Sequence, residues 1–161
     1  MRVVNYKGPG IYALYNVRMN KVYIGKSKNI RRRMQDHVRS FEEKNAALNP
    51  MYADNVEDFA FIVLHKSSTD EFEKYGTILE QIYMNEIMQH IQLYNVSTYS
   101  EQHIYNNLLD IFKISDHTNK AFRNALGMYP CMLGSQPERR INAFINRAID
   151  EAMERGRREK E

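Results

Sequence analysis

The chain has 161 residues, of which 43% are hydrophobic, and it carries a formal net charge of +3. This length predicts one domain, or a small domain with an extension, and the apolar content is sufficient for a buried core. No apolar run approaches the roughly 20 residues that span a bilayer, and the first residues lack the apolar stretch of a signal peptide. A membrane-spanning or secreted protein is therefore not expected.

The charge is distributed unevenly along the chain. Residues 1–45 contain 11 Lys and Arg against 3 Asp and Glu, residues 46–100 contain 2 against 8, and residues 101–161 contain 10 against 9. Either a basic face binds a polyanion such as nucleic acid, or the opposite charges meet in the fold and cancel. The single cysteine, Cys131, excludes an intrachain disulfide and favours a reducing, cytoplasmic location.

Two strands joined by a turn come first in the chain. Residues 11–16 and 21–26 alternate apolar and polar side chains, and residues 16–20 carry turn chemistry, which predicts a β-hairpin. The tripeptide Gly10-Ile11-Tyr12 begins the first strand, and Tyr23-Ile24-Gly25 lies in the second. The two glycines are expected to let the backbone turn or approach a substrate closely.

A helix is predicted from Ile30, with Asn29 as its N-cap. Its apolar stripe consists of Ile30, Met34, Val38 and Phe41. Arg33 and His37 lie one turn apart on the edge of this stripe, so their side chains can meet. Residues 44–58 are expected to form a loop, and residues 59–65, apolar on both faces, a third strand.

A second helix is predicted to begin after a capping box made by Ser68 and Glu71 and to run to about residue 90. Glu80 lies beside its apolar stripe. Residues 93–96, which include Asn95, then predict a short extended segment. The remaining chain shows helical periodicity over 100–113, 116–126 and 137–158.

Several polar residues are of the types that phosphodiester hydrolysis uses. Hydrolysis needs a base for the attacking water, a fixed cation for the phosphate and a Lewis acid for the leaving oxygen. Arg33 presents a planar fork that matches phosphate oxygens. Glu80 is a carboxylate of the kind that holds Mg²⁺ together with water and phosphate oxygens. For each of them the alternative is an ordinary solvated side chain on a helix.

The tyrosines Tyr12 and Tyr23 are the candidates for the base. A phenol with a pKa near 10 is a poor base at neutral pH, because only about 0.1% of it is ionised. A neighbouring cation would lower that pKa, and we expect Lys26 to do so from the same strand end, which slightly favours Tyr23. His37 offers a second route for the proton because its unperturbed pKa is near neutral. Alternatively, both tyrosines are packing residues.

Taken together, the two tripeptides, Lys26, Arg33, His37, Glu80 and Tyr94-Asn95 resemble the GIY-YIG nuclease family. The resemblance covers residues 8–98, and its spacing is most similar to that of the intron homing endonucleases and the excision-repair nuclease. It implies an α+β fold with a small three-stranded antiparallel sheet flanked by helices. It also implies cleavage of DNA with one divalent metal, Mg²⁺ or Mn²⁺, and an Asn95 that orders the site by hydrogen bonds.

Residues 99–161 carry no catalytic signature and are predicted to be a helical extension. It would contact DNA through a helix-turn-helix, wrap the sheet or form a dimer surface. Since one site cuts one strand, a double-strand break needs a homodimer, a second event or rebinding. Two alternatives to a nuclease acting on double-stranded DNA remain: a catalytically silent binding module of the same fold, and a nuclease acting on RNA or single strands.

Overall fold

The computed structural model describes residues 4–96 together with residues 150, 154 and 158. The predicted helices at 100–113 and 116–126 lie outside the described residues. The predicted helix at 137–158 is described only at three positions, where the backbone is helical. No helix in the described part of the chain is both long enough and apolar enough to cross a membrane.

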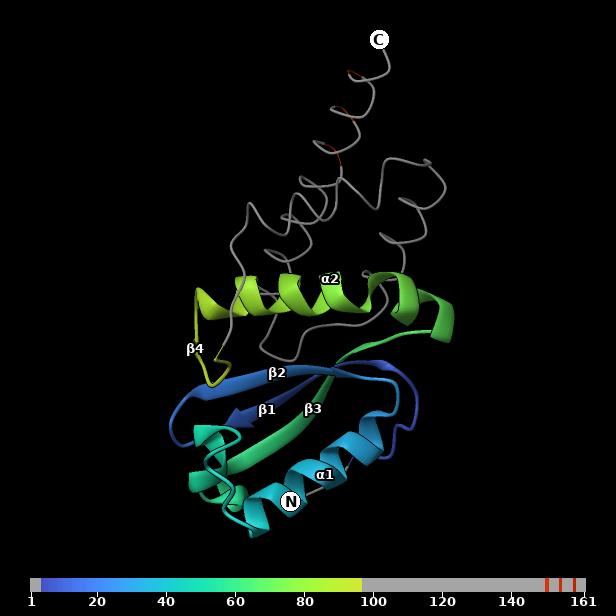
Figure 1. The fold of residues 1–161 in the computed structure, drawn as a ribbon. Coiled ribbons are helices and arrows are strands. Elements are labelled where there is room, and N and C mark those ends of the chain that lie inside the picture. Colours follow the sequence, from blue (N-terminus) through green and yellow to red (C-terminus); the bar gives the residue numbers. More distant parts are fainter. Residues whose placement is uncertain (1–3, 97–149, 151–153, 155–157, 159–161) are drawn as a thin grey trace.

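The centre of the fold is one mixed sheet with the strand order β3-β1-β2-β4 (Figure 1). Its strands are β1 (Gly10–Asn16), β2 (Lys21–Ser27), β3 (Phe59–Lys66) and β4 (Gln92–Leu93). The strand β1 is antiparallel to both of its neighbours, whereas β4 is parallel to β2. The predicted α+β class and the three antiparallel strands are confirmed, and the two-residue β4 adds a fourth strand.

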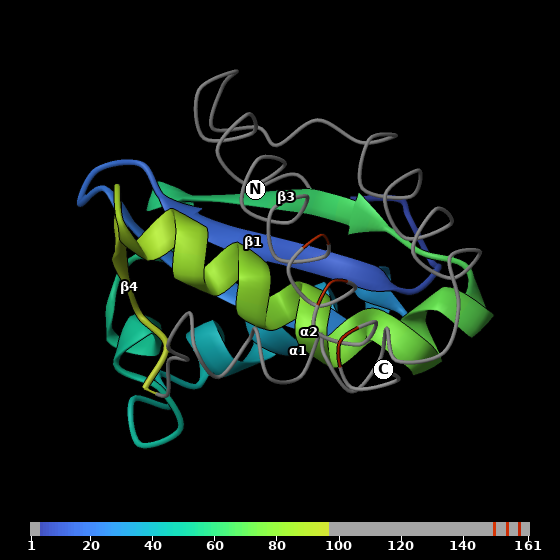
Figure 2. The same ribbon diagram turned by 90° about the horizontal axis from the view of Figure 1, so that it is seen from above.

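A helix covers each face of this sheet (Figures 1 and 2). The helix α1 (Ile30–Glu42) lies on one face and α2 (Thr69–Met88) on the other. Between α1 and β3, the expected loop contains two 3₁₀ turns, Pro50–Ala53 and Val56–Asp58. These turns lie on the α1 side of the sheet (Figure 1). Their residues Met51 and Tyr52 belong to the same core cluster as Phe41 of α1, and Val56 packs against it.

Both predicted N-caps are confirmed. The Asn29 side chain accepts a hydrogen bond from the backbone N–H of Arg32, and Ser68 accepts one from the N–H of Glu71. The Glu71 carboxylate lies 2.6 Å from Nε2 of His65, so it contacts β3 as well as beginning α2. The caps fix where each helix starts and therefore which residues of α1 face the sheet.

Strand alternation divides the side chains of the hairpin between the two helices. Tyr12, Leu14 and Tyr23 belong to the core on the α1 face. Ile24 and Lys26, which have the opposite parity from Tyr23 in β2, face α2. The two faces therefore carry different sets of the residues singled out in the sequence.

Candidate functional site

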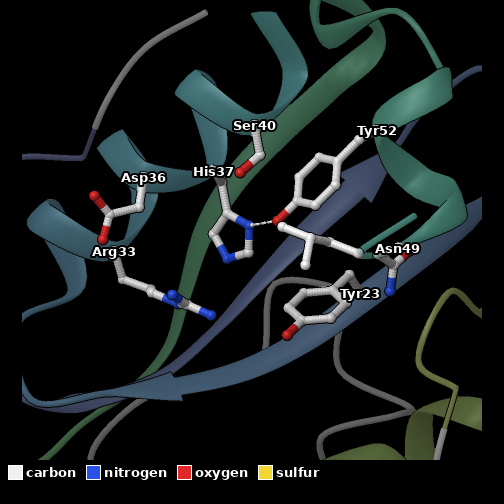
Figure 3. Close-up of a pocket in the computed structure, with 8 residues that line it drawn as sticks. Tyr23, Arg33, Asp36, His37, Ser40, Asn49 and Tyr52 are labelled. Carbon is white, nitrogen blue, oxygen red and sulfur yellow. Dashed lines mark hydrogen bonds between the residues drawn. The ribbon is translucent and has the colours of Figure 1, made fainter. Parts of the chain in front are cut away.

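A pocket of about 240 Å³ opens between α1 and the segment 48–52. Its walls include Tyr23 from β2, Arg33 and His37 from α1, and Tyr52 from the first 3₁₀ turn (Figure 3). In this view the Arg33 side chain extends past the His37 ring toward the hydroxyl end of Tyr23. Three separate elements thus bring a cation, an imidazole and two phenols to one place.

Tyr12 lies behind the pocket and is only 1% exposed. It pairs across the strands with Gly25, and its ring covers that glycine: a β-carbon at Gly25 would lie 2.5 Å from the Tyr12 ring and hydroxyl. Gly10 plays a similar part, because a β-carbon there would lie 2.0 Å from the His65 carbonyl oxygen. The glycines of both tripeptides therefore make room for neighbouring residues within the sheet rather than forming a turn.

His37 connects two tyrosines. Its Nε2 lies 2.7 Å from the Tyr12 hydroxyl, and its Nδ1 lies 2.7 Å from the Tyr52 hydroxyl. Its ring also meets the Tyr23 ring edge-on at a centroid distance of 5.4 Å. The imidazole is 2% exposed, so the two phenols take the place of water as its hydrogen-bonding partners.

Sequence reasoning missed Tyr52. It follows Pro50 in a segment that shows neither helical nor strand periodicity, and its partner His37 is fifteen positions away. The only local signal is Asn49 before Pro50, a combination typical of the start of a helical turn. The structure has a 3₁₀ turn there, with Asn49 as its cap, but contact with His37 depends on how the loop packs against α1.

Burial sets the protonation states of this group. It raises the pKa of Tyr12, whereas a hydrogen bond from Arg33 and the positive charge of Arg33 act to lower that pKa. Burial likewise raises the pKa of Tyr23, and the charge of Arg33 again opposes it. Burial, together with the charge of Arg33, lowers the pKa of His37 to about 3. At neutral pH the tyrosines are therefore phenols and the histidine is neutral.

The expectation that Lys26 sits beside Tyr23 and lowers its pKa is wrong. Residues 23 and 26 have opposite parity in a strand, so their side chains lie on opposite faces of the sheet. The Lys26 ammonium donates a hydrogen bond to the Thr77 hydroxyl of α2 at 2.7 Å. The cation beside the tyrosines is Arg33 instead.

The charge of Lys26 acts on Glu80 instead. Burial raises the pKa of the Glu80 carboxyl, while the charge of Lys26 and a hydrogen bond from its backbone N–H act in the opposite sense. The charge of Glu80 in turn raises the pKa of Tyr23. The carboxylate is therefore close enough to Tyr23 to act on it electrostatically. Across residues 4–96 and the three C-terminal positions, no cluster of three or more His, Cys, Asp or Glu could hold a metal ion, so any metal here would be bound by few protein ligands.

Asn95 continues the sheet with its side chain. Beyond β4, its Oδ1 accepts the backbone N–H of Ile24 at 2.9 Å, and its Nδ2 donates to the Ile24 carbonyl at 2.7 Å. One residue earlier, the Tyr94 N–H bonds to the Val22 carbonyl at 2.7 Å. Along the edge of β2, ladder positions are thus filled by the backbone of Tyr94 and then by the amide of Asn95.

The structure therefore brings the seven predicted residues together in two groups on either side of β2. Tyr12, Tyr23, Arg33 and His37 lie on the α1 face. Lys26 and Glu80 lie toward α2, and Asn95 bonds to the strand edge between the two groups. Together the two groups contain what a phosphate-cleaving site needs: donors for an anion on one side and a carboxylate for a cation on the other.

Comparison with protein families finds a match over much of the chain. The model of the GIY-YIG catalytic domain matches residues 8–95, which is more than half of the chain and includes all seven predicted site residues. A search of curated proteins and a search of solved structures found no match.

Proposed function

Since the chain belongs to the GIY-YIG nuclease family, we propose that it is a divalent-metal-dependent endonuclease that hydrolyses phosphodiester bonds of DNA. The observation that carries this proposal is the convergence of Arg33, His37 and the two tyrosines on one pocket, with Glu80 in electrostatic reach of Tyr23. The strongly basic segment 1–45 would lie along the nucleic acid, so binding should weaken as salt is added.

The base is a relay of neutral groups. Since burial raises the pKa of Tyr23, a phenolate is scarcely populated at neutral pH. Tyr23 lines the pocket, receives the proton of the attacking water and passes its own proton to the neighbouring Tyr12, whose ring centroid lies 6.4 Å from that of Tyr23. Tyr12 passes its proton to Nε2 of His37, 2.7 Å away. The water oxygen forms its bond to phosphorus as the bond from phosphorus to the leaving oxygen breaks.

Arg33 has two roles in this scheme. Its guanidinium, exposed at the pocket, pairs with the phosphate oxygens and stabilises their growing negative charge. Burial is the first cause of the low pKa of His37, and in the absence of substrate the charge of Arg33 lowers it further. A bound phosphate cancels much of that charge and raises the pKa of His37. Substrate binding therefore removes one of the two effects that oppose proton transfer to His37.

The carboxylate of Glu80 fits a hard divalent cation. Mg²⁺ is often bound through one or two carboxylates, with water and substrate phosphates completing its shell, and among the described residues Glu80 belongs to no cluster of three or more potential metal ligands. The backbone N–H of Lys26 holds this carboxylate in place. When bound, Mg²⁺ or Mn²⁺ would neutralise charge on the leaving oxygen. Asn95 keeps β2 aligned between the two groups.

The test is cleavage of supercoiled plasmid with Mg²⁺, with Mn²⁺ and with a chelator, using the full chain. Glu80→Gln keeps the shape and a hydrogen-bond acceptor for Lys26 but removes the charge, and we expect its rate to fall by roughly 100-fold or more. Glu73→Gln, at an exposed position of the same helix, is the matched control and should cleave normally. Equal rates for Glu80→Gln and the unmodified protein would refute the metal assignment.

The substrate arms of the same experiment separate the alternatives. Cleavage of RNA or single-stranded DNA in preference to plasmid would indicate a nuclease of different substrate class. Binding without cleavage of any of the three would indicate a silent nucleic-acid-binding module.

A further inference from the structure

The imidazole of His37 is shared by two phenols that the mechanism has to treat differently. Tyr12 lies on the Nε2 side and takes part in the relay, whereas Tyr52 lies on the Nδ1 side. Figure 3 shows the Tyr52 hydroxyl directed at the ring, with the hydrogen bond drawn between them. The proposed reaction gives Tyr52 no step, yet its hydroxyl is as close to the ring as that of Tyr12.

The two hydrogen bonds are coupled because a neutral imidazole has one N–H donor and one nitrogen acceptor. One phenol must therefore donate to His37 and the other must accept. If Nδ1 carries the proton, Tyr52 accepts and Tyr12 donates, so Nε2 can receive the proton of Tyr12. If Nε2 carries the proton, the hydrogen bonds between His37 and the tyrosines run in the opposite direction. The tyrosines then present a donor instead of an acceptor to the water.

The surroundings favour the first arrangement. The Tyr12 hydroxyl is buried, with 1% of the residue exposed, and among the described residues Nε2 of His37 is the acceptor at hydrogen-bonding distance from it. A buried hydroxyl whose proton finds no acceptor costs free energy, so Tyr12 donates to Nε2. Tyr52 lines the pocket, so its own proton can be donated to water there while its oxygen accepts the proton of Nδ1.

We propose that Tyr52 is a positioning residue whose oxygen accepts the Nδ1 proton of His37 and thereby fixes the tautomer that makes Nε2 the proton acceptor for Tyr12. The assignment of the tautomer stands on the geometry, while its effect on cleavage rests on the proposed function. The pocket holds Tyr52 firmly for this purpose: it is 7% exposed, and its ring packs edge-on against Phe41 at 5.0 Å between centroids.

The test combines one substitution with one spectroscopic measurement. Tyr52→Phe keeps the ring and its packing against Phe41 and removes only the hydroxyl. Without that acceptor, an N–H at Nδ1 would be buried without a partner, so the ring should change to the Nε2–H form. We expect kcat for plasmid cleavage to fall at least about tenfold with little change in KM, since Tyr52 does not contact the water or the phosphate in the mechanism.

Nitrogen-15 NMR of histidine-labelled protein reports the tautomer without any substrate. The His37 signals are assigned as those lost in His37→Gln, and we expect the Nδ1–H form in the unmodified protein and the Nε2–H form in Tyr52→Phe. The control is Tyr15→Phe, which removes a tyrosine hydroxyl that bonds to Asn20 on the other face of β1. It should change neither the tautomer nor kcat.

Each outcome bears on one proposal. A protein inactive on plasmid, single-stranded DNA and RNA would refute the proposed function, and the tautomer of His37 would still test the role of Tyr52. An active protein with the Nε2–H form would refute the positioning role, as would an unchanged kcat in Tyr52→Phe. Should Tyr52→Phe melt at a much lower temperature, the tautomer of the unmodified protein decides.

Discussion

The contact between Gly25 and the Tyr12 ring leads to a strong prediction for Gly25→Ala. The added β-carbon would lie 2.5 Å from both Cζ and the hydroxyl oxygen of Tyr12. Favourable contacts between carbon atoms lie at about 3.5–4.0 Å, so the Tyr12 ring has to move by about 1 Å. Neither strand can easily absorb that movement, because residues 12 and 25 are direct partners in the antiparallel pair of β1 and β2.

The movement should disconnect the relay. The Tyr12 hydroxyl lies 2.7 Å from Nε2 of His37, and a shift of about 1 Å away from it takes the pair out of hydrogen-bonding range. Displacements of about 1 Å in an active site can cost about 100-fold in rate, and that is the loss we expect for Gly25→Ala. The overpacking should also lower the free energy of unfolding by about 1–3 kcal/mol.

Initial rates of plasmid nicking and thermal melting curves test this. The control is Gly76→Ala in α2, whose nicking rate should be unchanged. The new β-carbon would lie 3.1 Å from the partly buried Phe72 ring, and alanine favours the helix by roughly 1 kcal/mol. If the effect acts through Tyr12, then Gly25→Ala should add little to Tyr12→Phe. A normal rate for Gly25→Ala, or an equal loss in the Tyr12→Phe background, would refute the reasoning.

Three further predictions concern the other residues of the site. Arg33→Lys keeps the charge but loses the bidentate fork, and we expect cleavage to fall by at least about tenfold, whereas Arg32→Lys, exposed on the same helix, should cleave at the normal rate. Because burial raises the pKa of Glu80, its carboxylate should be protonated at a higher pH than that of an ordinary glutamate. Mg²⁺ binding, measured by calorimetry, should therefore weaken as the pH falls through that raised pKa and recover above it. A midpoint at or below the ordinary pKa of glutamate would contradict this. Asn95→Asp removes the donor to the Ile24 carbonyl, which should lower the free energy of unfolding in urea by about 1–3 kcal/mol; an unchanged denaturation midpoint would show that this bond contributes little.

The parts of the fold that sequence predicted are those set by local periodicity and caps. Asn29 and the spacing of Ile30, Met34 and Phe41 determine where α1 begins and which side is buried. That side in turn places Arg33 at the edge of the sheet and His37 against the tyrosines. The strand β4 was not predicted as a strand of the sheet, because two residues are too few to show a periodic pattern.

The error over Lys26 has a different origin. Nearness in sequence suggested that Lys26 acts on Tyr23, although the alternation of the predicted strand already places residues 23 and 26 on opposite faces. Tyr52 was out of reach for another reason. Its contact with His37 depends on how a loop folds back onto a helix, and such packing between distant segments leaves no local pattern in the sequence.

The open edge of β2 has a consequence for solubility. An edge strand with bare N–H and C=O groups is a template for pairing with another chain and hence for aggregation. Here the amide of Asn95 pairs with both the N–H and the carbonyl of Ile24, so a side chain of the candidate site also blocks strand addition. A change that leaves these groups bare, such as Asn95→Ala, would thus expose an unpaired strand edge as well as disturb the candidate site.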